Sequence, residues 1–203
     1  MAVLFPISTN GADPGRPDAE LWYAADWLAA READALLPAL RDSVQWETHR
    51  IRLFGHEVDS PRLSCWIGDE GTAYAYSGAR FEPKPWPSAL VPVRQRLEQE
   101  LQAGFNSVLA NRYRTGADSM GWHSDDEAAL GPQPVIASLS LGATRRFLVK
   151  PRQGAGERLA LDLVHGSLLV MRGATQQHYR HALPRTARPV GERINLTFRR
   201  IIG

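Results

Sequence analysis

The 203-residue sequence predicts an α+β fold in which helices precede a small antiparallel sandwich or barrel of the jelly-roll kind. Two observations predict it. Apolar residues in the first half recur every three or four positions, which is typical of helices, and from about Ser107 onward the period changes to two. The later apolar segments are short and are separated by Gly, Pro and polar turns, as antiparallel strands are.

The first elements follow a Gly-, Pro- and Asn-containing segment. Residues 1–18 are expected to form a flexible leader ahead of a single domain over 19–203. L-W-Y-A-A-D-W-L, residues 21–28, predicts a strand. A helix is expected over Ala30–Arg41, with a kink at Pro38 because proline removes one helical hydrogen bond.

A second helix and a series of strands follow. Leu90, Val93, Leu97 and Leu101 are spaced by three or four, with charged residues between them, so they predict an amphipathic helix. Strand patterns then lie at residues 108–113, 135–141, 146–150, 167–171 and 194–198.

Composition excludes some classes of protein. No apolar run approaches the roughly 20 residues of a membrane span, so we expect no integral membrane protein. The N-terminus lacks a basic leader and a cleavage site, which indicates no signal peptide. The single cysteine, Cys65, excludes an intramolecular disulfide and suits a reducing cytoplasm. We expect a cytoplasmic monomer.

The positive charge of the chain is almost all arginine. Only Lys84 and Lys150 are lysines among 24 basic residues, and the formal net charge is +2. A GC-rich genome would produce this bias, but arginine also offers planar, bidentate grips on phosphates and carboxylates. A net charge this small permits a nucleic-acid partner without arguing for one.

The last predicted strand, R-I-N-L-T-F-R, has one polar and one apolar face. Such a polar face can lie in water, or it can line the mouth of a barrel, where its arginines would have to meet anions. Asn111 and Tyr113 alternate on their own strand and would add an amide and a phenol to the same pocket. The residues of the polar face are Arg193, Asn195, Thr197 and Arg199.

G-W-H-S-D-D-E contains half of a candidate metal site. His123 and Asp125 are two residues apart, so they point the same way on a strand. His181 is a candidate third ligand from a distant strand, and spacing alone cannot choose between it and His178. Two imidazoles and one carboxylate suit the open facial site of Fe(II) oxygenases, with zinc as the alternative. The arginine pair favours iron with a dicarboxylate co-substrate.

Six motifs resemble, in this order, the AlkB family of Fe(II)- and 2-oxoglutarate-dependent dioxygenases. They are N-R-Y-R, D-S-M-G-W-H-S-D-D-E, I-A-S-L-S-L-G-A-T-R-R-F, H-G-S-L-L-V-M, H-A-L-P and R-I-N-L-T-F-R. The resemblance is greatest to the branch with animal AlkB homologues two and three. It implies a double-stranded β-helix (jelly-roll, cupin-like) core over 105–203, N-terminal helices packed on one sheet and a nucleotide-recognition lid over 45–78.

The resemblance also implies the roles of the site residues. Fe(II) would be held by His123, Asp125 and His181, because H-A-L-P matches the family at His181 rather than at His178. Arg193 with Tyr113 would hold the remote carboxylate of 2-oxoglutarate, with Arg199 nearer the metal. The full co-substrate set would be Asn111, Tyr113, Arg193, Asn195 and Arg199, with Thr197 assisting.

The implied activity is oxidative demethylation of alkylated bases. Fe(II), 2-oxoglutarate and O2 would remove the methyl group of 1-methyladenine or 3-methylcytosine in DNA or RNA, releasing formaldehyde, succinate and CO2. One alternative is a dioxygenase that hydroxylates a protein side chain or a small molecule. Another is a non-catalytic nucleic-acid-binding module, which the intact set of candidate ligands argues against.

A base inside a duplex must be flipped out to be reached, so residues of the lid are expected to hold it. Each candidate also has an ordinary structural explanation in core packing or a solvated turn. Tyr74 and Tyr76 would stack on the base, and Asp126 and Glu127 would balance the charge of the lesion. Leu53 and Phe54 would form a wedge into duplex DNA, with Arg62 and Trp66 as further lid contacts.

Overall fold

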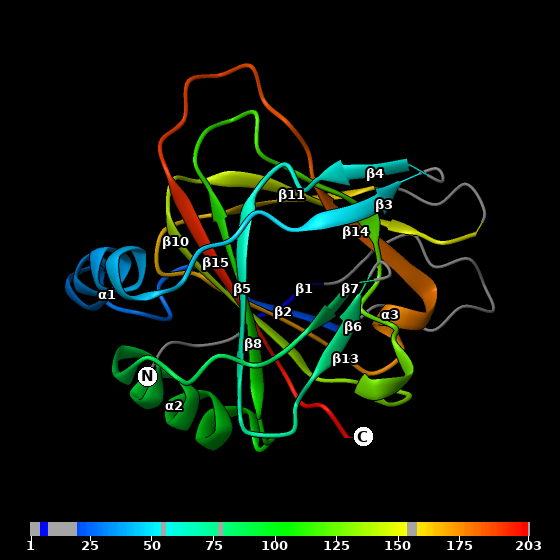
Figure 1. The fold of residues 1–203 in the computed structure, drawn as a ribbon, viewed down its shortest axis with the longest axis horizontal. Helices are drawn as coiled ribbons and strands as arrows, with labels where there is room; N and C mark the ends of the chain where they lie inside the picture. Colours follow the sequence, from blue (N-terminus) through cyan, green and yellow to red (C-terminus); the bar gives the residue numbers. More distant parts are fainter. Residues whose placement is uncertain (1–4, 8–19, 54–55, 77–78, 154–157, 203) are drawn as a thin grey trace.

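The computed structural model describes residues 5–7, 20–53, 56–76, 79–153 and 158–202 (Figure 1). Within these ranges the side chains are described except at 5–7, 51–53, 74–76 and 79–80.

Two antiparallel sheets form the body of the structure. The larger has seven strands in the order β1-β2-β13-β10-β15-β8-β5, and the smaller has four in the order β12-β11-β14-β9. The strands of the larger sheet are β1 (Phe5–Ile7), β2 (Glu20–Ala24), β13 (Leu168–Arg172), β10 (Ile136–Gly142), β15 (Arg193–Arg199), β8 (Ser107–Tyr113) and β5 (Leu63–Gly68). Those of the smaller are β12 (Leu159–Leu163), β11 (Arg145–Pro151), β14 (Tyr179–Leu183) and β9 (Met120–His123).

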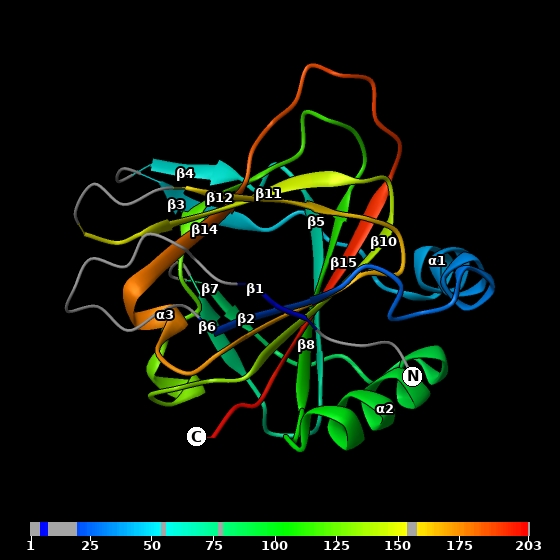
Figure 2. The same cartoon turned by 180° about the vertical axis from the view of Figure 1, so that it is seen from behind.

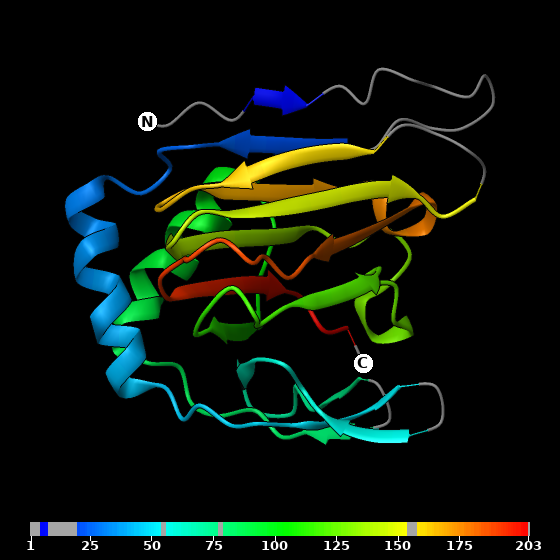
Figure 3. The same ribbon diagram turned by 90° about the horizontal axis from the view of Figure 1, so that it is seen from above.

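Two hairpins lie outside these sheets. They are β3 (Arg50–Leu53) with β4 (His56–Asp59), and β6 (Tyr74–Tyr76) with β7 (Ala79–Phe81). In Figure 3 the β3–β4 hairpin lies apart from the stacked strands, on the side opposite β1. Both hairpins are built from the segment that the sequence assigns largely to a lid.

The helices pack on one face of the larger sheet, as predicted. They are α1 (Ala30–Ser43) and α2 (Val91–Leu101), which lie together on one side of the molecule (Figure 2). Their buried residues share one apolar cluster with the outward-facing residues of the sheet. From the helices this cluster includes Ala33, Leu36, Leu40, Val93, Leu97 and Leu101, and from β15 it includes Ile194, Leu196 and Phe198.

A second apolar cluster fills the space between the two sheets. Phe147 and Val149 of β11 meet Ile136 of β10 and Leu169 and Met171 of β13 in it. Strand β15 lies in the middle of the larger sheet, between β10 and β8, and all seven of its residues are buried. One of its faces therefore packs under the helices, while the other looks into the sandwich.

Several boundaries differ from the predictions. The strand predicted at 21–28 ends at Ala24, where the chain turns. The first helix continues through Pro38 to Ser43, two residues past its predicted end. Residues 5–7 of the predicted leader form β1 and pair with β2, so the chain is a strand at these positions; the rest of the leader lies outside the described residues.

The segment predicted as a lid, residues 45–78, belongs partly to the main sheet and partly to the two hairpins. Residues 63–68 form β5, which pairs with β8 along its length, so this part is an edge strand of the main sheet. The edge position is stabilised by burial of Cys65 and Ile67 against the helices. The two hairpins lie outside the two main sheets. None of the helices in the described part of the chain is long and apolar enough to span a membrane.

Candidate metal and co-substrate site

Three side chains of the ligand type meet between the sheets. The antiparallel pairing of β9 with β14 places His123 directly opposite His181, with ring centroids 4.2 Å apart. Asp125 follows β9 by two residues, and its Oδ2 lies 3.6 Å from Nε2 of His181. One ligand atom from each residue lies within 4.8 Å of the others. His178 is outside this group, at the end of the short helix α3 (Thr175–His178).

The protonation of the three groups suits a cation. Burial, together with the neighbouring His123, lowers the pKa of His181 to about 3. Burial also lowers the pKa of His123. Burial by itself raises the pKa of Asp125, but the charges of Arg199 and of the two histidines outweigh it and bring that pKa to about 2. At neutral pH the site therefore offers two neutral imidazoles and a carboxylate.

The rings are also oriented. Nδ1 of His123 lies 2.8 Å from the carbonyl oxygen of Gly121, and because a carbonyl only accepts, this nitrogen carries the proton. The lone pair is then on Nε2, the nitrogen available to a metal. Phe147 stacks on His181 at 5.3 Å between centroids, with an angle of 29° between the planes.

The polar faces of β8 and β15 line the same cavity as the three candidate ligands. The sequence left open whether the polar face of the last strand meets water or the interior, and the structure places it inside. The cavity is bordered by Asn111, Tyr113, Arg193, Asn195, Thr197 and Arg199 together with His123, Asp125 and His181.

Arg193 is the most deeply buried cation of this cavity. Its side chain donates to Oγ of Ser140 at 2.9 Å and lies 5.2 Å from the ring centroid of Tyr113. Its Nε is buried and has no hydrogen-bond partner among the described residues. Burial lowers the pKa of Arg193 to about 10, with only Tyr113 acting in the opposite direction. A buried guanidinium with no acidic partner in the described part of the chain fits a bound carboxylate.

The second arginine lies at the metal end of the cavity. Arg199 donates to Oδ1 of Asp125, and both side chains are buried. Between the two arginines, Nδ2 of Asn195 donates to Oγ of Ser138 at 2.8 Å, and Thr197 donates to Oδ1 of Asn195 at 3.1 Å. The strand thus presents one cation, Arg199, in contact with a candidate metal ligand, and a second, Arg193, on the same face of the strand. Which carboxylate of the co-substrate each arginine would hold stays a prediction.

Of the predicted lid residues, Arg62 lies next to the cavity, whereas Trp66 is buried in a packing contact. Nε of Arg62 donates to Oδ1 of Asn111 at 2.7 Å, so Arg62 contacts the lining of the cavity. Trp66 is 2% exposed, packs against Leu109 and donates to the carbonyl of Thr72 at 2.8 Å. This is a packing position, so a contact of Trp66 with substrate would require the covering residues to move.

The two acids after Asp125 have different surroundings. Asp126 is exposed and forms an ion pair with Arg152, whereas Glu127 is partly buried at the start of the 3-10 turn at 128–130. Their role toward substrate stays a prediction. The side chains of Leu53, Tyr74 and Tyr76, and the whole of Phe54, lie outside the described residues, so the wedge and stacking hypotheses stay predictions as well.

Two buried residues near the site were not predicted. Arg145 is 3% exposed and donates to the backbone carbonyls of Thr115, Asp118 and Pro184. Its alternation with Phe147 on β11 could have indicated an inward position. Gln176 is 1% exposed and accepts a hydrogen bond from the backbone N–H of Asp125 at 2.9 Å. No local pattern marks it, because its helix has only four residues.

The chain matches a family model described as 2OG-Fe(II) oxygenase superfamily over residues 20–199. It is 39% identical to DNA oxidative demethylase ALKBH2 of Mus musculus, over 84% of this chain and 76% of that protein. It is 40% identical to alpha-ketoglutarate-dependent dioxygenase alkB homolog 3 of Homo sapiens, over 86% of this chain and 64% of that protein. It is 35% identical to ALKBH2 of Arabidopsis thaliana, over 100% of this chain and 74% of that protein.

A solved structure, that of OsALKBH1, shares the fold. Its TM-score is 0.59 at 14% identity, over 91% of this chain and 98% of the other, which supports the predicted jelly-roll architecture. The donor set of two imidazoles and a carboxylate fits Fe(II), and the buried Arg193 fits a carboxylate such as those of 2-oxoglutarate. The chain belongs to the AlkB family within the 2OG-Fe(II) oxygenase superfamily, and it is a dioxygenase that depends on Fe(II) and 2-oxoglutarate.

Proposed function

We propose that this chain removes methyl groups from N-alkylated bases of nucleic acid, with 1-methyladenine and 3-methylcytosine as the lesions. The observation that carries the proposal is the convergence of His123, Asp125, His181, Arg193 and Arg199 on one cavity. Relatives named as DNA oxidative demethylases support the choice of substrate.

In the proposed site His123, Asp125 and His181 hold Fe(II). When bound, Fe(II) and 2-oxoglutarate supply the oxidising chemistry drawn from O2, with release of succinate and CO2. The protein contributes binding, orientation and the exclusion of competing reactions. Hydroxylation of the N-methyl group gives a hemiaminal, which releases formaldehyde and leaves the unmodified base.

The residues of β8 and β15 would orient the co-substrate. Arg193 and Tyr113 would take its remote carboxylate, because Arg193 has no acidic partner among the described residues. Arg199 would keep Asp125 ionised and fixed, since its guanidinium donates to that carboxylate. Asn111, Asn195 and Thr197 would add polar contacts between the two ends. The co-substrate would thus be bound in a single direction.

The acids beyond Asp125 would favour a cationic lesion. Methylation at N1 of adenine or N3 of cytosine blocks the pairing edge and leaves the base positively charged. Asp126 is exposed and pairs with Arg152, whereas Glu127 is partly buried, so we propose that Glu127 makes the closer contact with the base. The base would have to be flipped out or single-stranded to reach the cavity. We expect the protein to act as a cytoplasmic monomer on DNA, with RNA as a second substrate.

A single assay tests the proposal. The protein is incubated with Fe(II), 2-oxoglutarate, O2 and an oligonucleotide carrying 3-methylcytosine, and the base and succinate are measured by mass spectrometry. We expect loss of the methyl group with an equal amount of succinate, and neither product with Asp125→Ala. Turnover of 2-oxoglutarate only with a protein or small-molecule substrate, and an unchanged base, would contradict the proposed function.

A further inference from the structure

The segment that follows β9 is tied to the segment that leads into β14. The hydroxyl of Ser124 donates to the carbonyl of Tyr179 at 2.7 Å. The backbone N–H of Asp125 donates to Oε1 of Gln176 at 2.9 Å. Strand β9 ends at His123, so no strand pairing fixes Asp125. These two hydrogen bonds fix the backbone of this segment, where the hydrogen bonds of a paired strand would otherwise do so.

The amide of Gln176 is itself fixed. The residue is 1% exposed, and its Nε2 lies 3.4 Å from Sδ of Met171. The amide nitrogen is a donor, so this contact turns the oxygen of the same amide toward the N–H of Asp125. The oxygen and the nitrogen of the amide therefore each have one partner, and these two contacts fix the orientation of the side chain.

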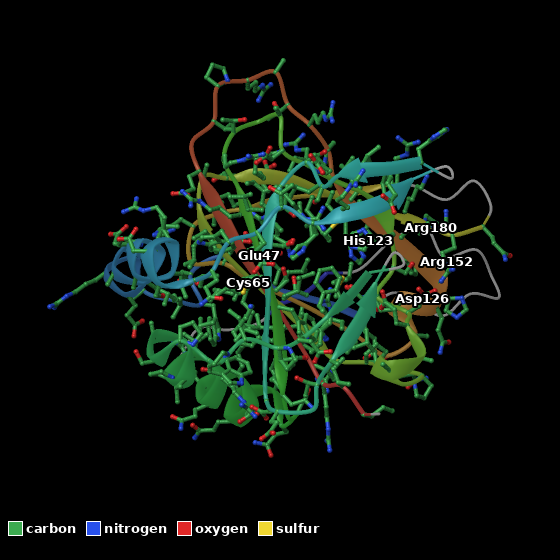
Figure 4. All side chains as sticks on the ribbon, viewed as in Figure 1. Glu47, Cys65, His123, Asp126, Arg152 and Arg180 are labelled. Carbon is green, nitrogen blue, oxygen red and sulfur yellow. The ribbon has the colours of Figure 1, made fainter. Side chains whose placement is uncertain are left out.

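Arg152 provides a further link between the same two segments, nearer the surface. Arg152 forms an ion pair with Asp126 and also donates to the carbonyl of Gln176 at 3.3 Å. Asp126 and Arg152, which form this ion pair, are both labelled in Figure 4. Three consecutive residues, Ser124 to Asp126, are thus connected to the stretch from Gln176 to Tyr179, directly or through Arg152.

We propose that Gln176 is a positioning residue for the metal ligand Asp125, an inference that rests on the proposed function. Arg199 sets the carboxylate end of Asp125, and Gln176 sets its backbone end. Gln176 lies five residues before His181 on the segment that enters β14. The same hydrogen bond therefore holds two ligands from distant parts of the sequence at a fixed separation.

Metal sites respond measurably to such partners. Removing a group that orients a ligand commonly weakens metal binding by about 10–100-fold. A residue that only stabilises the fold would lower the unfolding temperature of the metal-free protein without changing the coordination geometry. Metal affinity and the absorption spectrum of the bound metal separate these two roles, and neither requires turnover.

The experiment titrates metal-free protein with Co(II) alone, in the absence of 2-oxoglutarate and O2, and records the visible absorption of the bound ion. Gln176→Met keeps the volume and removes the acceptor, so we expect about 10-fold weaker binding and an altered spectrum. Gln176→Glu keeps an oxygen at the same distance and adds a negative charge near the metal, so we expect it to bind Co(II) more tightly than Gln176→Met does. Gln177→Leu changes the exposed neighbour and should leave both readouts unchanged.

Equal Co(II) affinity and equal spectra for Gln176→Met and the unmodified protein would overturn the inference. So would equal weakening by Gln176→Met and Gln176→Glu, because the second retains the acceptor. If Gln176→Met does not fold, Gln176→Asn replaces it with an amide one methylene too short, and the same weakening is expected. Failure of the unmodified protein to bind Co(II) would overturn the proposed metal site itself, which distinguishes the two failures.

Discussion

Replacing Arg193 by methionine should stabilise the protein without co-substrate and abolish its response to 2-oxoglutarate. The fall of the Arg193 pKa from 12.5 to about 10 corresponds to roughly 3 kcal/mol, at about 1.4 kcal/mol per factor of ten. Loss of the hydrogen bond to Ser140 offsets about 1 kcal/mol of this. The net gain of about 2 kcal/mol should raise the unfolding temperature by about 4–8 °C.

Thermal unfolding with and without Co(II) and 2-oxoglutarate measures both effects. A ligand at about 100 times its Kd adds about 2.7 kcal/mol to the stability of the unmodified protein. The Arg193→Met variant should still be stabilised by Co(II), but adding 2-oxoglutarate should not raise its unfolding temperature any further. Arg146→Met, at an exposed arginine paired with Asp162, is the matched control and should keep the full response. An Arg193→Met variant that is less stable, or that 2-oxoglutarate stabilises normally, would refute the reasoning.

Other predictions concern the metal ligand, the substrate acid, the ion pair of the buried Asp118 with Arg114, and the cysteine. Asp125→Ala should lose turnover and bind Co(II) at least about 10-fold more weakly in a titration, because one of three ligands is gone; near-normal turnover would mean that the ligand is wrong. Glu127→Gln should reduce the preference for cationic over neutral lesions in competition assays while Co(II) affinity is kept; an unchanged preference would return Glu127 to a structural role. Asp118 is 5% exposed, and although burial alone raises its pKa, hydrogen bonds from Arg114 lower it overall. Its contribution is therefore present above the unfolded pKa of about 3.9 and lost as the pH falls through the lower folded value. Asp118→Asn should cost about 1–3 kcal/mol in urea unfolding at neutral pH and progressively less in acid; a cost independent of pH would contradict this. Burial raises the pKa of the Cys65 thiol to about 11, so iodoacetamide at about pH 8 should label it at least about 100-fold more slowly in the folded than in the unfolded protein; similar rates would disprove the burial.

Local patterns were sufficient for the helices and the central strands. The spacing of Val93, Leu97 and Leu101 depends on the helical repeat alone, and these residues are buried as predicted. The alternation in R-I-N-L-T-F-R likewise separates two faces, whatever lies against them. Shorter strands were not delimited: β12 was not predicted, and β9 and β14 were expected only as strands that carry His123 and His181. Their apolar alternation covers only four or five residues, and their partners come from distant parts of the chain.

The sequence by itself determined the chemical inventory: the H-x-D triplet, the two arginines of the last strand and the family motifs. Only the tertiary structure decided that the polar face of β15 points into the sandwich, because the alternation separates a polar from an apolar face but does not say whether the polar one meets solvent or a cavity. The pairing of β9 with β14 placed His123 opposite His181 and left His178 outside the group, in agreement with the choice that the H-A-L-P motif implied. The hydrogen bond from Asp125 to Gln176 joins residues 51 positions apart. Such contacts leave no local pattern, since they depend on where the chain returns in space.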